Sequence, residues 1–271
     1  MRTIMKLISI LLLSMFLMPS WAFANSDTAD GWLVTSRLDK GAVGIRYEMK
    51  NDILTKVRIK KGDSAYVYSL MKSSPLETEW FPVQMGDGSY EVAVLENVSG
   101  NKYRIAAMKT VEVKVDEASD VFLNPVQNVD WVNASKTVAK AKELTRNSKT
   151  DAQKVTAIYK YVVGSIRYDK ELAKKVQSEY VPDLDETLVS RKAICYGYAS
   201  LFAAMLRSEG IPTKVVMGTS TAVTEYHAWN EVLLNGKWVV VDTTVDAGNQ
   251  AAGNKTVMAK KAADYQAEKI Y

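Results

Sequence analysis

The 271-residue sequence contains a single cysteine, Cys195, and a single histidine, His227. One cysteine cannot form a disulfide within the chain, so the fold must be held together by packing alone. One cysteine and one histidine are also a poor basis for a zinc site, whose ligands come mainly from these two residue types. We therefore expect neither a disulfide framework nor a metal centre, and no cofactor is implied.

Neither sign of charge dominates the composition. Lysine and arginine number 35 against 31 aspartate and glutamate, which gives a formal net charge of +4. Arg2 and Lys6 belong to an amino-terminal segment that we expect to be removed, and losing both lowers +4 by two to +2. A nearly balanced charge gives no strong attraction to nucleic acid or to anionic membranes, so we expect no nucleic-acid partner.

Long apolar runs are scarce, and the one clear example is residues 7–18. This run follows a short basic start and precedes the small-residue pattern Ala-Phe-Ala at 22–24. The run is shorter than the roughly 20 residues that a spanning helix needs, and the whole pattern is typical of a secretory signal peptide. We therefore predict a signal peptide over 1–24, a secreted or cell-envelope location, and no membrane insertion after its removal.

The remaining chain divides into two parts by its hydrophobic pattern. Residues 25–118 contain short β-type segments such as VEVKV at 111–115, separated by turn glycines. This spacing predicts a small β-sandwich-like domain. Residues 116–133 look like a boundary, and the period becomes helical after them, so we assign 119–271 to a second domain of the α+β class.

Three helices are expected in the second domain, at 133–147, within 150–170 and at about 195–208. The second carries a stripe of apolar residues at helical spacing, and Thr150 or Asp151 would cap its start. The third ends in EGIP, with Gly210 at the carboxyl-terminal cap, before a buried strand.

The stretch YHAWNEVLLNGKWVVVDTT at 226–244 predicts a β-hairpin, because Asn-Gly is the strongest short hairpin signal. A two-residue loop pairs Leu234 with Lys237, and counting back along the strands puts His227 and Asp242 on one face as diagonal neighbours. Their β-carbons would be about 7 Å apart, which an aspartate and an imidazole can bridge. Glu231 lies on the same face and is a weaker candidate for the acid.

Cys195 is predicted to open a helix, and this position favours a thiolate. Unpaired N–H groups and the helix dipole stabilise negative charge in a first turn. A nearby histidine can take the thiol proton while an acid orients its ring. Cys195, His227 and Asp242 thus supply the parts that covalent thiol chemistry needs, although a buried cysteine that only fills space is the alternative.

These residues lie in a recognisable pattern. CYGYASLFAAMLRSEGIPTKVVMG, then HAWNEV, then KWVVVDTT, resembles the transglutaminase-like core of the papain-type superfamily over about residues 133–246. The resemblance implies helices packed on an antiparallel sheet and a catalytic triad of Cys195, His227 and Asp242. It also implies Tyr168, within the segment IRYD, as a weak candidate for stabilising an oxyanion, beside the backbone N–H of Cys195.

One departure from the pattern follows the cysteine, where many transglutaminases have tryptophan and this chain has Tyr196. We name Tyr196 and Trp229 as candidates for lining the site, while Trp229 and Trp238 would otherwise be core aromatics. The resemblance implies acyl transfer from a carboxamide or peptide bond of a protein or peptide substrate, through a thioester. Two alternatives stay open: a cysteine protease or amidase with the same triad, and a non-catalytic binding module of the cell envelope.

Overall fold

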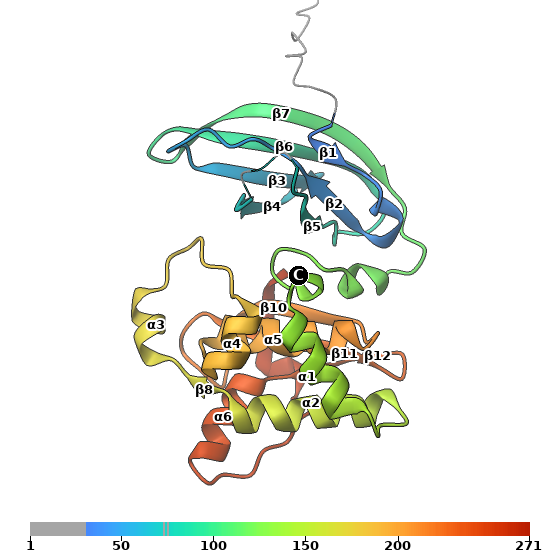
Figure 1. Ribbon diagram of the computed structural model, residues 1–271, viewed down its shortest axis with the longest axis vertical. Coiled ribbons are helices and arrows are strands. Elements are labelled where there is room, and N and C mark those ends of the chain that lie inside the picture. The colour runs from blue at the N-terminus through green and yellow to red at the C-terminus, as the bar shows by residue number, and fades with distance from the viewer. Residues whose placement is uncertain (1–30, 73, 75) are drawn as a thin grey trace, which may run out of the picture.

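The computed structural model describes residues 31–72, 74 and 76–271, and the predicted signal peptide at 1–24 lies outside them. Figure 1 shows a curved layer of strands from the first half of the sequence lying over a body of helices and a second set of strands. Within the described residues, none of the helices has the length and apolar character needed to cross a membrane.

The upper layer consists of two antiparallel sheets, which confirms the expected sandwich-like arrangement (Figure 1). The first has the order β1-β2-β5, formed by Leu33–Val34, Ala42–Ile45 and Glu79–Pro82. The second has the order β4-β3-β6-β7, formed by Ser64–Ser69, Thr55–Lys61, Gly88–Ser99 and Lys102–Val113. Strand β3 alternates buried and partly exposed residues, which is the period-two pattern of a sheet with one face in the core.

The lower body contains a third antiparallel sheet and six α-helices within the described residues. The sheet has the order β12-β11-β10-β13, formed by Lys237–Val241, His227–Leu234, Thr213–Ser220 and Tyr265–Ile270. The helices are α1 (Ser135–Thr145), α2 (Asp151–Ser165), α3 (Lys170–Lys175), α4 (Leu184–Ser190), α5 (Cys195–Ser208) and α6 (Thr243–Ala251). A short parallel pair joins β8 (Arg167–Tyr168) to β9 (Lys192–Ala193). Helices packed on an antiparallel sheet are the expected fold class.

Helices α2 and α5 form where the sequence predicts them, and their ends have identifiable causes. The Thr150 side chain accepts a hydrogen bond from the Gln153 N–H and so caps α2. Helix α5 ends before Gly210, which has φ +79°, a conformation that glycine adopts without strain. Both helices bury their apolar residues against the same core, beside Val232 and Val241 of the sheet.

The strand layer and the lower body share one hydrophobic core. Tyr68 and Phe81 of the upper layer lie in the same cluster as Ala199 of α5 and Val215 of β10. The segment between β7 and α1 is tied to this core by Arg207, whose buried guanidinium donates to the Asn124 carbonyl oxygen and to two others. The predicted boundary between residues 118 and 119 therefore falls in a connection packed between the two parts.

The hairpin has the predicted turn, but its second strand is shorter than expected. Asn235 and Gly236 both have positive φ, and Leu234 pairs with Lys237, as predicted. We expected the strand to run on to Thr244, but it ends at Val241 and α6 begins at Thr243. The change of direction occurs because Asp242 caps the new helix, so its side chain accepts a hydrogen bond from the chain ahead of it.

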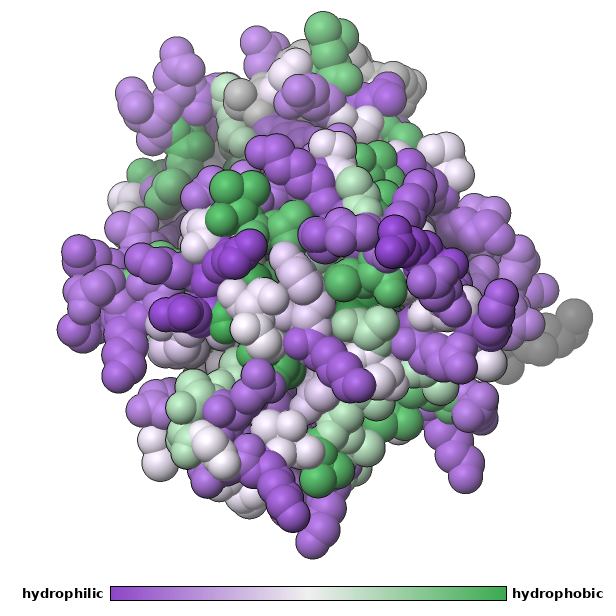
Figure 2. Space-filling view, turned by 60° about the horizontal axis from the view of Figure 1, so that its bottom comes forward, coloured by the Kyte–Doolittle hydropathy of each residue, from purple (hydrophilic) through white to green (hydrophobic). Residues whose placement is uncertain are grey.

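Hydrophilic side chains cover most of the face shown in Figure 2, in which the lower end of Figure 1 comes forward. Apolar side chains appear there in small separate groups. Groups of this size are normal on a soluble surface and do not by themselves mark a docking site.

The pairing of β13 with β10 depends on Gly218. The register shifts between Met217 and Gly218, and a Cβ placed on Gly218 would lie 2.0 Å from the Gln266 carbonyl oxygen. We expect Gly218→Ala to lower the free energy of unfolding by about 1–3 kcal/mol, the usual cost of overpacking. Urea unfolding followed by circular dichroism measures this change.

The matched control is Gly248→Ala in α6, where a Cβ would meet nothing within 4 Å. Because alanine is a better helix former than glycine, this variant should gain about 0.5–1 kcal/mol. Equal stability of the two variants would contradict the close approach at Gly218.

Candidate active site

Cys195 is the first residue of α5 and is partly exposed. Ile194, the residue before it, has an extended backbone and no side-chain oxygen that could cap the helix. The N–H groups of the first helical turn therefore receive no hydrogen bond from a capping side chain. These N–H groups and the helix dipole favour negative charge on the Cys195 side chain. The structure thus places Cys195 at the start of a helix, as the sequence predicts.

Two buried hydrogen bonds fix α5 against its neighbours. Asn230 of β11 donates from its side chain to the Ala199 carbonyl oxygen of α5 at 2.9 Å and to the Lys214 carbonyl oxygen of β10 at 3.0 Å. Tyr198 of α5 donates to the Ile166 carbonyl oxygen at 2.6 Å. Asn230 lies three residues after His227, and its partner Ala199 lies four residues after Cys195. This hydrogen bond therefore fixes the start of β11 relative to the start of α5.

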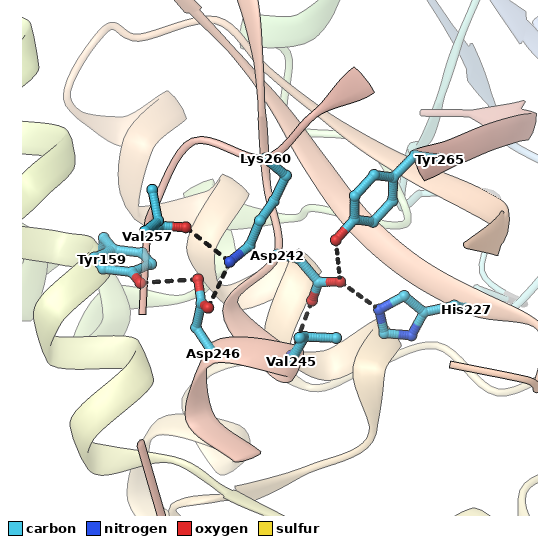
Figure 3. A network of polar contacts seen from close by, with 8 residues as sticks. All are labelled: Tyr159, His227, Asp242, Val245, Asp246, Val257, Lys260 and Tyr265. Atoms are coloured by element: carbon cyan, nitrogen blue, oxygen red, sulfur yellow. Dashed lines mark hydrogen bonds and ion pairs between the residues drawn. The ribbon is translucent and has the colours of Figure 1, made fainter. Parts of the chain in front are cut away.

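His227 is the first residue of β11, where it pairs with Gly218 of β10 and is 4% exposed. Its Nε2 lies 2.8 Å from Oδ2 of Asp242 (Figure 3). This contact leaves Nδ1 as the ring nitrogen that can serve a thiol. Cys195 lies near enough to His227 to be among the causes of the raised pKa of the imidazole.

Asp242 is fully buried, and three donors satisfy its two oxygens. Oδ1 accepts a hydrogen bond from the Val245 N–H at 3.0 Å, which caps α6. Oδ2 accepts from His227 Nε2 and from the Tyr265 hydroxyl at 3.0 Å (Figure 3). The sequence argument placed Asp242 on a strand as a diagonal neighbour of His227. The contact exists, but it is made from the helix cap.

The charges around His227 alter its proton affinity. Burial is the largest influence and lowers the pKa, but hydrogen bonds and charge interactions with Asp242 and Cys195 outweigh it and raise the pKa to about 9. The imidazolium form is therefore favoured up to about pH 9 when the thiolate is present. A cationic ring beside a thiolate is the arrangement expected of an activated cysteine.

A cleft of about 970 Å³ opens beside these residues, and Cys195, His227 and Tyr168 are among the side chains that line it. Tyr168 reaches the cleft because β8 runs beside β9, the strand that leads into Cys195. Burial, Cys195 and Glu225 raise the pKa of Tyr168, so its hydroxyl keeps its proton and can donate a hydrogen bond.

Tyr196 and Trp229 lie beside the site and are not among the residues that line this cleft. The Tyr196 hydroxyl accepts a hydrogen bond from Asn128 at 2.6 Å, and its ring contacts Tyr180 edge to face. Trp229 is 2% exposed and stacks on the His227 ring, with 6.3 Å between ring centroids. Trp229 thus packs beside the imidazole ring of His227.

The remaining two candidates lie at the other end of the sheet. Glu231 forms an ion pair with Lys214 at 2.8 Å, so it is engaged away from His227. The Trp238 ring packs under the Lys214 ammonium at 4.0 Å and against Phe122 edge to face. Trp238 is therefore a packing residue, and Asp242 is the acid that contacts His227.

Sequence reasoning missed Tyr265, Tyr159, Asp246 and Lys260, which form two neighbouring networks (Figure 3). Tyr265 stands at the start of β13, packs against Trp229 and donates to Asp242. Asp246 follows Asp242 by one helical turn and accepts hydrogen bonds from Tyr159 at 2.8 Å and from Lys260. Once α6 is known, the four-residue spacing of Asp242 and Asp246 would have indicated a shared face.

Among residues 31–72, 74 and 76–271, no group of three or more histidine, cysteine, aspartate and glutamate side chains is placed to hold a metal ion. The arrangement of Cys195, His227 and Asp242 is suited to moving a proton between a thiol and an imidazole whose orientation is fixed.

The segment that contains these residues is similar to known proteins. Residues 138–243 match the family model of the Transglutaminase-like superfamily. The kyphoscoliosis peptidases of Mus musculus and Homo sapiens are each 33% identical over 116 residues, which is 39% of this chain and 17% of each peptidase. The match therefore takes in less than a fifth of either relative.

Solved structures also align with the chain, at low sequence identity. A candidate cysteine protease from Cytophaga hutchinsonii is 18% identical with a TM-score of 0.44, covering 81% of this chain and 83% of that one. The periplasmic domain of TgpA from Pseudomonas aeruginosa is 14% identical with a TM-score of 0.41, covering 75% and 94%.

The matched segment begins in α1 and ends directly after Asp242. It therefore contains the start of α5, the start of β11 and the residue that caps α6, which are the three places from which the site is built. Over residues 138–243, the chain is similar to the Transglutaminase-like superfamily.

Proposed function

We propose that the protein is an acyl-transfer enzyme with Cys195 as nucleophile, His227 as general base and acid, and Asp242 as the group that orients His227. The observation that carries the proposal is the 2.8 Å contact of His227 Nε2 with Asp242, made by a ring that lines the same cleft as Cys195. The cleft beside them gives a substrate access to the thiol. A binding module without catalysis would have no need of this arrangement.

The proposed chemistry begins when the thiol proton of Cys195 moves to His227. The sulfur then attacks the carbonyl carbon of a carboxamide or peptide bond, and a C–S bond forms. The C–N bond breaks as the imidazolium gives its proton to the leaving ammonia or amine, which leaves a thioester. An amine or water, deprotonated by His227, then attacks the thioester and releases the cysteine as a thiolate.

The negative oxygen formed in each attack needs hydrogen-bond donors. The backbone N–H of Cys195 lies in the unpaired first turn of α5 and is one donor in this proposal. The Tyr168 hydroxyl is the second, since it lines the cleft and its raised pKa keeps it protonated.

The proposed substrates are proteins or peptides outside the cytoplasm, because residues 1–24 have the pattern of a signal peptide. An exported protein whose amino-terminal sequence starts near Asn25 would support this location. The attacking group is either an amine, which gives a transglutaminase, or water, which gives a protease or amidase. Hydrolysis is the second candidate because the aligned mammalian relatives are named peptidases.

We expect iodoacetamide to alkylate Cys195 rapidly at pH 6, and to alkylate the His227→Ala variant only above about pH 8, as for an unassisted thiol with a pKa of about 8.5. The His227 pKa of about 9 means that the supporting imidazolium is present from pH 6 up to about pH 9. The measurement is the alkylation rate against pH, read by intact mass. Because the chain has one cysteine, each added group reports on Cys195. Identical profiles for both proteins would remove the basis of the proposal.

Tyr265→Phe should slow alkylation at pH 6 several-fold, because Asp242 loses a donor on the oxygen that holds His227. The control is Tyr159→Phe, which removes a hydroxyl from the neighbouring Asp246 and leaves Asp242 untouched. Each variant should lose about 1–3 kcal/mol of stability, the cost of an unpaired buried acceptor. Equal effects on alkylation would show that Tyr265 acts only on stability.

The choice between amine and water is tested with a labelled primary amine and a glutamine-containing protein. Covalent incorporation of the label by the parent indicates transfer, whereas release of ammonia or a new amino terminus without label indicates hydrolysis. Cys195→Ala should do neither, because it has no nucleophile. Label incorporation by Cys195→Ala at the parent rate would refute a role for the thiol.

A further inference from the structure

One side of the cleft beside Cys195 is basic. Arg167 and Lys170 are both exposed and both line the cleft. Arg191 and Lys192 are exposed beside them, since Arg167 pairs with Lys192 in the β8–β9 ladder and the Arg167 N–H donates to the Arg191 carbonyl oxygen at 2.9 Å. Four cations thus gather where the chain approaches Cys195.

These four cations carry no acidic partner. Elsewhere on the surface, lysines pair with acids, as Lys174 does with Glu171 at 3.0 Å. Within the described part of the chain, neither an ion pair nor a side-chain hydrogen bond is formed by Arg167, Lys170, Arg191 or Lys192. The charges of Arg167 and Lys170 therefore face the cleft that these residues line, and those of Arg191 and Lys192 face the solvent beside it, where they can act on a ligand.

One carboxylate also lines the cleft. Glu225 lies in the loop before His227 and lines the cleft without an ion pair among the described residues. Apart from Cys195 and His227, the lining therefore holds two cations, Arg167 and Lys170, and one carboxylate, Glu225.

We propose that this cleft selects acidic peptides, and that Arg167 and Lys170 bind a carboxylate close to the carbonyl that Cys195 attacks. Arg191 and Lys192 strengthen the same field from behind. This inference rests on the proposed function and deepens it, because it names the substrate class. Since charges in a cleft act over several ångströms, the preference does not require one fixed contact geometry.

The first experiment uses two small reagents that react with the same thiolate, iodoacetate and iodoacetamide. Iodoacetate is an anion and iodoacetamide is neutral, so the ratio of their rates reports the field at Cys195 and cancels any change in the amount of thiolate. We expect the Arg167→Gln/Lys170→Gln double variant to lower this ratio about fivefold, as removal of two charges near the thiol predicts. Raising the salt concentration should lower the parent's ratio as well.

Two variants serve as controls for the rate ratio. Lys237→Gln removes an exposed charge beside the hairpin turn at the far end of β12 and should leave the ratio unchanged. Glu225→Gln removes the opposing charge and should raise the ratio. An unchanged ratio in the double variant, or an equal fall in Lys237→Gln, overturns the proposal.

The second experiment compares peptides that carry the same glutamine. One has a neighbouring glutamate and blocked termini, one has a neighbouring lysine and blocked termini, and one has neutral neighbours and a free terminal carboxylate. We expect the parent to have a higher kcat/KM for the glutamate peptide than for the lysine peptide, by about tenfold, and the double variant to lose this difference. If the peptide with the free terminal carboxylate reacts faster than the glutamate peptide, the carboxylate that the cleft binds is that of a peptide terminus and not that of a side chain.

The outcomes separate this inference from the function beneath it. If the glutamate and lysine peptides react equally in the parent, acidic selection is wrong and the acyl-transfer proposal stands. If neither peptide acylates Cys195, the proposed function fails for these substrates. The ratio of the iodoacetate rate to the iodoacetamide rate then still tests the inference by itself, because an unchanged ratio in the double variant would show that Arg167 and Lys170 exert no field at Cys195.

Discussion

The site depends on the carboxylate of Asp242, which performs two tasks from a fully buried position. Oδ1 caps α6 and so turns the chain away from the sheet, and Oδ2 holds the His227 ring. An isolated buried carboxylate is costly, and it is tolerated here because Val245, His227 and Tyr265 all donate to it. The end of β12, the direction of α6 and the orientation of the imidazole therefore share one cause.

The second constraint is the docking of α5 on the sheet. A thiol near a helix dipole becomes useful only if the helix start stays within reach of His227, and the buried side chain of Asn230 fixes that distance from the middle of β11. The upper strand layer contributes to the same end. It shares its core with α5, and Asn128 of the connecting segment donates a hydrogen bond to Tyr196, the residue after Cys195.

Much of the lower body was predictable because its signals are local. The Asn235-Gly236 turn sets the hairpin register, and the cap at Thr150 and the stop at Gly210 mark helix ends. The segment after Asp242 was not predictable in this way. Strand β13 is polar and mostly exposed, so it lacks the alternation that identifies a strand, and it forms only through pairing with the distant β10. Tyr265 depends on that pairing, and no feature around it in the sequence points to Asp242.

The contact of Tyr265 with Asp242 has a consequence for the order in which the protein is made. A ribosome completes Cys195 and His227 well before it reaches the strand that carries Tyr265. Until β13 has been synthesised and paired, Asp242 lacks one of its donors and the imidazole is held less firmly. A growing chain therefore carries Cys195 and His227 before Asp242 has all of its donors, and the site is completed only when β13 pairs with β10.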